Sequence, residues 1–491
     1  MRRKSWIGAI DRRVMSEVAR TDSVLLDQVL PTLGRSANYG RLWLGVAGAL
    51  AATRNRSARR GALRGLVALS LASAVANVVS KQVVGRARPA VDLTPLARRL
   101  VKAPRTTSFP SGHSASAAAF TTGVVLESPL LGVPVAALAA AVAGSRVAVG
   151  AHYPSDVVAG VSLGVAAGLL TRWWWPLTPQ GPAESGAPSR PVPAEPTGQG
   201  LVLVTNAKAG TSHDAVLRVL ADELPAAEIV IASPDDDLPT VIEDAARRCS
   251  VLGVAGGDGT INLAARIAAG KDVPLLVVPA GTLNHFARDL GVDTAADAIM
   301  ALRAGQAVRV DLGTAGDQVF VNTSSIGLYV DLVRFREHWE GRLGKWPAML
   351  VGLVHILRHA APQDMVVDGE LRQLWMLYAG NCRYQPIGFA PTHRSRLDDG
   401  LLDVRIVDAT ERFARTRIVL AVLTGTLRWC PAYQPSVRSD LVVAATDGTI
   451  ELSVDGEVTE VASRIELAKA PGALRVYRPA GAATGPDGCT G

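Results

Sequence analysis

The sequence is poor in cysteine, and its few cysteines lie far apart. Among 491 residues there are four, with no CxxC pair: Cys249, Cys382, Cys430 and Cys489. This spacing argues against a disulfide framework and against a cysteine-rich zinc site, and it suits a reducing cytosol. The charged start of the chain, MRRKSWIGAIDRR, lacks an apolar core, so no cleaved signal peptide is expected.

Acidic residues are scarce in the first part of the chain only. Residues 1–175 hold 22 Lys and Arg but 7 Asp and Glu, whereas the remaining residues hold 29 and 37. A basic part followed by an acidic part indicates two units in different surroundings. The basic residues stand beside apolar runs rather than on one uniformly basic face, so no nucleic-acid partner is expected.

Long apolar runs are also lacking, because most runs in the basic part are shorter than the roughly 20 residues that a membrane span needs. They are rich in Ala and Gly, which is typical of close-packed membrane helices, and they occupy residues 42–52, 65–79, 114–126, 131–145 and 157–170. The Trp residues of TRWWWP after the last run favour a membrane interface. We predict an all-α transmembrane helical bundle over residues 1–175, with a soluble helical bundle as the alternative.

The rest of the chain predicts a linker and two further domains. Residues 176–199 are rich in Pro and Gly, as semi-extended linkers are. Short β-rich runs then alternate with helix-like segments, which predicts an α/β domain with a parallel sheet over residues 200–307. Strand-like runs dominate residues 308–478 and predict a β-rich antiparallel domain, and residues 479–491 are expected to be a disordered tail.

Three polar clusters interrupt the apolar runs, namely KQVVGRARP, PSGH and SRVAVGAHYPSD. Lys81, Arg88 and Arg146 supply three fixed cations, which suit a phosphate group because Arg can bind it through two nitrogen atoms. Ser111 and Gly112 directly precede an apolar helix, whose first N–H groups bind anions. The clusters therefore predict a phosphate site at one end of the bundle.

Two histidines could supply a nucleophile and a general acid for reaction at this phosphate. His152 and Asp156 are four residues apart, so one helical turn brings them together. A His can attack phosphorus when an acid group holds its other ring nitrogen, and a second His, His113, can protonate the leaving oxygen.

The pattern K-x6-RP, PSGH and SR-x5-H-x3-D resembles the signature of the type 2 phosphatidic acid phosphatase (PAP2) superfamily at every position. The resemblance implies that His152 is the nucleophile that forms a phosphohistidine, Asp156 its orienting partner and His113 the general acid. It implies no metal or other cofactor. It also implies a phosphate held by Lys81, Arg88, Ser111, Gly112 and Arg146.

A second set of polar loops follows three of the predicted strands. The motif GGDGT is neither a P-loop nor a dinucleotide fingerprint, but its glycines let the backbone approach phosphates closely. Asn206 and Lys208 follow an earlier strand, and Gly281 and Thr282 follow a later one. Loops at successive strand ends form one ligand crevice at the carboxyl edge of a parallel sheet.

This set looks like the diacylglycerol kinase catalytic family, over about residues 200–478. The resemblance implies catalysis by Asp258, a base at Asp455 supported by Glu457, and Mg²⁺ ordered by Asp398 and Asp403. It implies an ATP site formed by Asn206, Lys208, Gly256, Gly257, Gly259, Thr260, Gly281 and Thr282. The family usually has Asn-Pro in the first loop, and here Ala207 follows Asn206.

The distribution of positive charge predicts an orientation in a cell membrane. The arginine-rich loop 53–64 is expected in the cytoplasm, which puts the loops 81–113 and 150–156 outside and the chain after residue 175 inside. The predicted phosphatase site then faces outward and the predicted kinase shares the cytoplasm with ATP. Five spans leave the basic N-terminus outside, which a further span within residues 23–34 would correct.

We therefore predict a multi-pass bifunctional lipid enzyme of the plasma membrane. One part phosphorylates a lipid alcohol with ATP, and the other hydrolyses a lipid phosphate monoester or pyrophosphate. Diacylglycerol, a sphingoid base and a polyprenyl alcohol remain open as kinase substrates, and the sequence leaves a homodimer open. Two alternatives are a lipid kinase with a membrane anchor and a regulatory lipid-binding module without activity.

Overall fold

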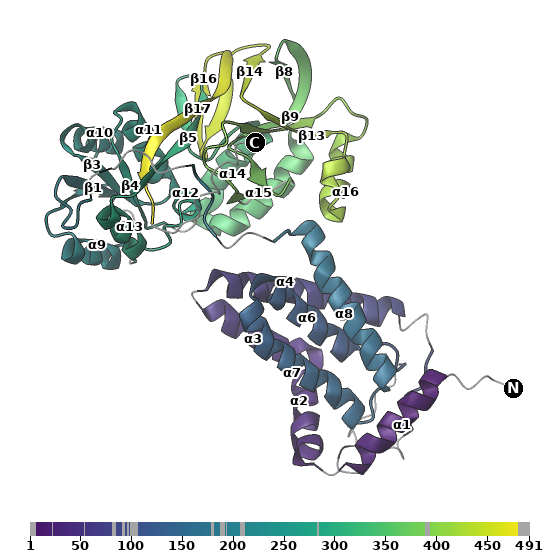
Figure 1. Ribbon diagram of the computed structural model, residues 1–491. Helices are drawn as coiled ribbons and strands as arrows, with labels where there is room; N and C mark the ends of the chain where they lie inside the picture. The colour runs from purple at the N-terminus through teal and green to yellow at the C-terminus, as the bar shows by residue number, and fades with distance from the viewer. Residues whose placement is uncertain are drawn as a thin grey trace, which may run out of the picture. The chain divides into compact units, whose positions relative to one another are not determined.

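The computed structural model divides into two compact units, Met1–Leu177 and Thr178–Gly491, which are described separately (Figure 1). It describes residues 6–21, 23–53, 55–80, 85–90, 94, 95, 98, 107–177, 181–186, 192, 194–206, 212–281, 284–387 and 393–479. Of the predicted site residues, Lys81, Lys208 and Thr282 lie outside these ranges, as does the predicted tail from residue 480 onward.

The N-terminal unit is helical. All five apolar runs form helices, and α6 contacts α4, α7 and α8. The helices are α1 (Trp6–Arg20), α2 (Leu30–Ser36), α3 (Arg41–Ala52), α4 (Arg56–Ala74), α6 (Gly112–Glu127), α7 (Pro129–Ala148) and α8 (Pro154–Trp174). Glycine permits their close approach, since a Cβ on Gly123 would lie 2.5 Å from the backbone nitrogen of Gly65. Small residues thus bring α4 and α6 into backbone contact.

Two helices of the described residues, α7 and α8, are long and apolar enough to cross a bilayer, at 20 and 21 residues. The prediction of a helical unit is confirmed, while the five-span bundle stays a prediction. The segment 23–34, where a further span was expected, contains the short η1 (Leu25–Val29) and the start of α2. At about 1.5 Å per residue, these twelve or so residues cannot cross the roughly 30 Å hydrocarbon core.

The C-terminal unit begins with a parallel sheet in the order β2-β1-β3-β4. Its strands are β1 (Leu201–Asn206), β2 (Glu228–Ala232), β3 (Val251–Gly256) and β4 (Leu275–Pro279). Helices of this part are α9 (Ser212–Glu223), α10 (Leu238–Arg248), α11 (Asp258–Gly270), α12 (His285–Asp289) and α13 (Ala295–Ala304). The strands β1, β3 and β4 are buried almost throughout, which is why they read as continuous apolar runs.

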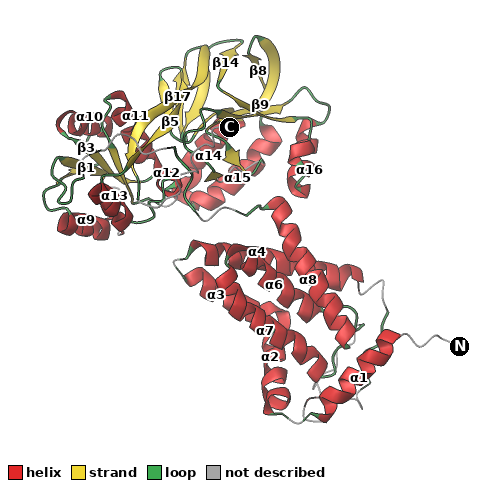
Figure 2. Ribbon diagram, viewed as in Figure 1, coloured by secondary structure: helices red, strands yellow, loops and turns green. Residues whose placement is uncertain are grey.

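Antiparallel strands continue the same sheet, so that the unit contains one mixed sheet. The long β17 (Arg464–Tyr477) joins the parts, pairing in parallel with β4 at Val476 and antiparallel with β5 (Ala307–Ala315). The other main strands are β6 (Gln318–Phe320), β7 (Thr323–Gly327), β8 (Gln363–Val367), β9 (Glu370–Asn381), β12 (Leu402–Asp408), β13 (Tyr433–Arg438), β14 (Asp440–Ala445), β15 (Ile450–Val454) and β16 (Glu457–Val461). Figure 2 shows α14 (Leu328–Leu343), α15 (Lys345–His359) and α16 (Ala414–Thr424) to one side of these strands.

Part of the predicted linker packs on the C-terminal unit. Ala183 and Val192 are buried, the Ala183 N–H donates to the Asp289 carbonyl at 2.9 Å, and the Leu397 N–H donates to the Glu184 carbonyl at 3.0 Å. Its Pro-rich composition indicates no helix or strand, yet small apolar residues within it find buried positions. The boundary between the two units falls after Leu177, within the range 176–199.

Candidate active sites

His152 lies in the turn between α7 and α8, and its side chain is buried. Nδ1 lies 2.6 Å from the Ser108 carbonyl oxygen, so this nitrogen carries the proton and donates it. Nε2 is left with its lone pair, 3.5 Å from Nη1 of Arg88. Burial and the nearby Arg88 lower the pKa of His152 to about 3. The imidazole is therefore neutral at pH 7, as a nucleophile must be.

Asp156 is placed differently from its expected role. Its Oδ2 lies 3.9 Å from Nδ1 of His152, beyond hydrogen-bond distance, and accepts the Tyr153 N–H at 2.9 Å. Its Oδ1 accepts Nη1 of Arg86 at 2.6 Å. Asp156 thus holds the turn that carries His152, while the Ser108 carbonyl orients the ring. The reason is position, because the third residue of a helix caps the N–H groups at its start.

The basic residues near His152 provide donors for an anion. Arg146 is 4% exposed, its Nη1 has only a 3.5 Å contact with the Gly34 carbonyl, and its Nε has no hydrogen-bond partner within the described ranges. Arg88 donates to the Ala151 carbonyl at 2.6 Å. A buried guanidinium with unused donors is costly unless an anion completes its hydrogen bonds.

The PSGH residues form the start of α6. Ser111 caps this helix by accepting from the Ser114 N–H at 3.4 Å, and Gly112 is its first residue. His113 follows, with its Nε2 2.9 Å from Oδ1 of Asn38. Asn38 was not identified from the sequence, because a single Asn between two helices carries no motif.

Two glycine loops touch in the C-terminal unit. The GGDGT residues lie between β3 and α11, where Gly257 precedes the first helical residue, Asp258. A Cβ on Gly281 would lie 2.5 Å from the Cα of Gly257, so the second loop passes against the first. The Asp258 carboxylate accepts the His285 N–H at 2.7 Å and adds a further link between them. Asn206 ends β1, which is the neighbouring strand.

A cavity of about 280 Å³ adjoins the GGDGT helix, with Gly259, Asp455 and Glu457 in its lining. Asp455 accepts three backbone N–H groups, those of Val321, Asn322 and Thr323, at 2.8 to 2.9 Å. Burial raises the pKa of Asp455 to about 6, although these three hydrogen bonds oppose the shift. Oε1 of Glu457 lies 3.2 Å from the position that a Cβ on Gly259 would take. Glu457 therefore meets the glycine loop, whereas Asp455, the expected base, directs both oxygens at backbone N–H groups and is placed differently from its expected role.

Comparison with known families matches each unit separately. The model of the PAP2 superfamily matches residues 62–179, and the model of the diacylglycerol kinase catalytic domain matches residues 200–315. The chain is a fusion of these two families. We call Met1–Leu177 the PAP2 unit and Thr178–Gly491 the kinase unit.

The chain is similar to several known proteins, each over part of its length. A probable lipid kinase YegS-like protein of Pseudomonas aeruginosa is 30% identical over 295 residues, which cover 57% of this chain and 95% of that protein. A diacylglycerol kinase of Mycobacterium tuberculosis is 27% identical over 284 residues, covering 55% and 89%. The crystal structure of a transmembrane PAP2 type phosphatidylglycerolphosphate phosphatase from Bacillus subtilis is 22% identical, covers 34% of this chain and 86% of that one, and has a TM-score of 0.28.

The two carboxylates expected to order Mg²⁺ in the kinase unit form ion pairs with arginine side chains. Asp403 accepts Nε and Nη2 of Arg405 at 3.0 and 2.6 Å, and also the Tyr384 N–H at 3.0 Å. Asp398 accepts Nε of Arg396 at 3.1 Å and the Gly186 N–H. Carboxylates paired with guanidinium groups have no free oxygen pair for a hard cation. These residues do not fit Mg²⁺ in this arrangement, and no step is assigned to the ion.

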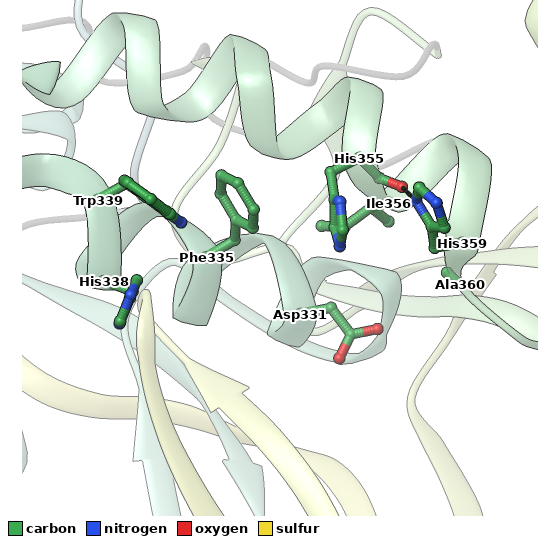
Figure 3. A pocket seen from close by; sticks show the side chains of 8 residues that line it. All are labelled: Asp331, Phe335, His338, Trp339, His355, Ile356, His359 and Ala360. Atoms are coloured by element: carbon green, nitrogen blue, oxygen red, sulfur yellow. Dashed lines mark hydrogen bonds between the residues drawn. The ribbon is translucent and has the colours of Figure 1, made fainter.

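A second cavity, of about 410 Å³, lies between α14 and α15 of the kinase unit. Figure 3 shows Phe335 and Trp339 of α14 facing His355 and His359 of α15, with ring centroids of Phe335 and His355 5.2 Å apart. None of those predicted site residues that the structure describes lines this cavity.

Sequence reasoning missed two residues that hold the PAP2 site together, Arg86 and Ser108. Nη1 of Arg86 binds Asp156, and the Arg86 carbonyl accepts the Ser108 N–H at 2.9 Å. Arg86 lies inside the x6 stretch of the signature, where the pattern specifies no residue. Ser108 orients His152 through its backbone carbonyl, and a backbone contact leaves no trace in side-chain type.

Proposed function

We propose that the chain is a bifunctional membrane lipid enzyme, with a lipid phosphatase in the PAP2 unit and an ATP-dependent lipid kinase in the kinase unit. The observation that carries the proposal is the presence of two separate sets of converging residues. One surrounds a neutral, buried His152 with arginine donors. The other sets Asp455 and Glu457 in a cavity beside two touching glycine loops.

In the PAP2 unit, Nε2 of His152 attacks the phosphorus of a lipid phosphate monoester or pyrophosphate. The bond from phosphorus to the leaving oxygen breaks, and His113 supplies the proton to that oxygen. Arg88 and Arg146 stabilise the charge on the transferred group. Water then attacks the phosphohistidine and gives a proton to His113, and the bond from phosphorus to Nε2 breaks, which releases phosphate and restores the neutral imidazole of His152.

In the kinase unit, the glycine loops hold the ATP phosphates through backbone N–H groups, and the lipid hydroxyl enters the cavity at Gly259. The geometry favours Glu457 as the group that accepts the hydroxyl proton. Asp455 has both oxygens directed at the backbone of residues 321–323, so it positions the turn that carries Glu457. Phosphoryl transfer asks mainly for such positioning.

We also propose that the two sites lie on opposite faces of a cell membrane, with the kinase unit in the cytoplasm. Support comes from the apolar α7 and α8 and from the arginines in the first turns of α4, Arg56, Arg59 and Arg60. His152 lies in the turn between α7 and α8, at the end of α8 opposite to Trp174, from which the chain continues to the kinase unit. A membrane-spanning α8 would therefore separate the two activities.

The experiment is a pair of radiolabel assays on the full chain in proteoliposomes. ATP labelled in its γ-phosphate is incubated with diacylglycerol, a sphingoid base or a polyprenyl alcohol, and labelled lipid is extracted. Lipid phosphates labelled in the phosphoryl group are incubated separately, and base-stable, acid-labile label on the protein reports phosphohistidine. If lipid becomes labelled but neither phosphate release nor phosphohistidine is seen, the chain is a lipid kinase whose PAP2 unit serves as an anchor. If neither activity is seen, the chain is a regulatory lipid-binding module.

A further inference from the structure

A buried carboxylate joins the first helix of the chain to the phosphatase site. Asp11 lies on α1, outside the three signature segments, and is 1% exposed. A carboxylate this deeply buried needs partners that offset its lost hydration. Most of its neighbours on α1 are exposed, so no pattern in the sequence predicts that Asp11 is buried.

The partners of Asp11 lie at the start of α8, next to His152. Oδ1 accepts the Ser155 N–H at 2.9 Å, and Oδ2 accepts the Ser155 hydroxyl at 2.7 Å. The first N–H groups of a helix have no partner within it, and here a residue of another helix supplies one. Asp11 therefore fixes the N-terminus of α8 from outside that helix.

Asp11 also holds the guanidinium of Arg86. Nη2 of Arg86 donates to Asp11 at 2.7 Å, while its Nη1 donates to Asp156 at 2.6 Å and to the Ser155 hydroxyl at 2.7 Å. The ring of Tyr153 stacks 4.4 Å from the same guanidinium. Hydrogen bonds from Ser155 and Arg86 outweigh the effect of burial and lower the pKa of Asp11. The pair is thus ionised at neutral pH.

Arg86 passes this restraint to the catalytic histidine by two routes. Through its side chain it fixes Asp156, which in turn binds the N–H of Tyr153, the residue after His152. Through its carbonyl it binds the Ser108 N–H, and the Ser108 carbonyl accepts Nδ1 of His152.

A second contact holds α1 in place. Arg98 is buried and donates to the carbonyls of Val18 and Thr21, at 2.7 and 2.5 Å. Its Nε also binds Asp27 at 2.6 Å. Because Arg98 fixes the end of α1 independently, the loss of Asp11 alone is expected to leave the helix docked.

We propose that Asp11 is a positioning residue of the phosphatase site, acting through Arg86 on the turn that carries His152. The proposal rests on the proposed phosphatase function. It makes α1 a part of the PAP2 site, although the matched PAP2 segment begins only at residue 62. A shift of about 1 Å in a reacting group can cost about 100-fold in rate. The expected loss in kcat for Asp11→Asn is therefore about 10- to 100-fold. The KM should change little, since Asp11 does not touch Arg88 or Arg146, the arginines proposed to bind the phosphate.

The test uses the full chain in detergent with a labelled lipid phosphate. Glu17→Gln on the same helix is the matched control, since the Glu17 side chain is 63% exposed and its carboxylate, among the described residues, pairs with Arg13 of its own helix at 3.3 Å. We expect wild-type kcat for Glu17→Gln and at least a 10-fold lower kcat for Asp11→Asn. The kinase activity of each preparation and the melting temperature of the PAP2 unit report folding.

A double-mutant cycle separates positioning from simple stabilisation. If Asp11 acts through Arg86, Asp11→Asn combined with Arg86→Gln has a kcat no lower than Arg86→Gln alone. Wild-type kcat in folded Asp11→Asn, or fully multiplicative losses in the cycle, would overturn the proposal. If Asp11→Asn does not fold, the variants Ser155→Ala and Arg86→Lys each weaken the contacts of one partner of Asp11. Wild-type kcat in both of these variants would also overturn the proposal. Phosphatase activity that survives His152→Ala would instead overturn the proposed function.

Discussion

The contact between the two glycine loops allows a sharp test of the kinase site. Gly281 of the second loop passes against Gly257 of the first, and substitution by Ala adds one carbon at this point. That carbon would lie 2.5 Å from the Cα of Gly257 and 2.8 Å from Oδ1 of Asn284. Carbon atoms in contact stand about 3.5 to 4.0 Å apart. The loops must therefore separate by about 1 Å or more.

This displacement falls on the groups proposed to hold the ATP phosphates. Misplacement of about 1 Å can cost about 100-fold in rate, so we expect kcat/KM for ATP in Gly281→Ala to fall about 100-fold. The phosphatase activity of the same preparation should be unchanged, because Gly281 belongs to the other unit.

The assay is transfer of labelled γ-phosphate to lipid over a range of ATP concentrations. Gly270→Ala is the matched control, because it also adds one carbon to a glycine of this domain, at the end of α11. Apart from its chain neighbours and the adjacent backbone of α11, no atom of the described residues lies within 4 Å of the added carbon. Gly270→Ala should retain wild-type kcat/KM. Equal kinetic constants for Gly281→Ala and the wild type would refute the reasoning that these loops form the nucleotide site.

Three further outcomes are expected. Arg146→Lys keeps the charge but loses the planar donors, so inorganic phosphate should inhibit the phosphatase at least 10-fold more weakly; unchanged inhibition would contradict the anion role. Asp455→Ala removes the acceptor of three buried N–H groups. Denaturant titrations should therefore show a free energy of unfolding of the kinase unit that is lower by about 3 kcal/mol or more. A loss below about 1 kcal/mol would count against this structural role of Asp455. Acidification below the ordinary pKa of 6.5 protonates His152 in the unfolded chain, but not in the folded chain until pH about 3. The PAP2 unit should lose stability over that range by up to about 1.4 kcal/mol per pH unit, and His152→Asn should flatten the dependence of melting temperature on pH.

Local patterns were sufficient to predict the two families and the helical and α/β character of the units. The PAP2 signature and GGDGT each fix several residue types at fixed spacing, and the family comparisons confirm both. Strand and helix periods are local too, so the parallel pairing of β1 to β4 followed from alternating patterns, although their order in the sheet did not. Continuity of the sheet through β17 could not be predicted, because it depends on pairing between β17 and strands far away in the sequence.

The contacts within the sites were less predictable for the same reason. The i and i+4 spacing of His152 and Asp156 suggested a direct hydrogen bond, but Asp156 caps α8 and binds Arg86 instead. Asp403 looked like a free carboxylate beside a turn, but Arg405, two residues later, points to the same side of β12 and pairs with it. Asp11 and Asn38 act across long sequence distances, and no spacing rule reaches them.

The central claim is that one chain holds two independent phosphoryl-transfer sites. The most direct measurement assays lipid phosphorylation and lipid-phosphate hydrolysis on the same purified full chain for the wild type, His152→Ala and Asp258→Ala. We expect His152→Ala to lose hydrolysis and keep phosphorylation, and Asp258→Ala to do the reverse. Loss of both activities in either folded variant would contradict the claim.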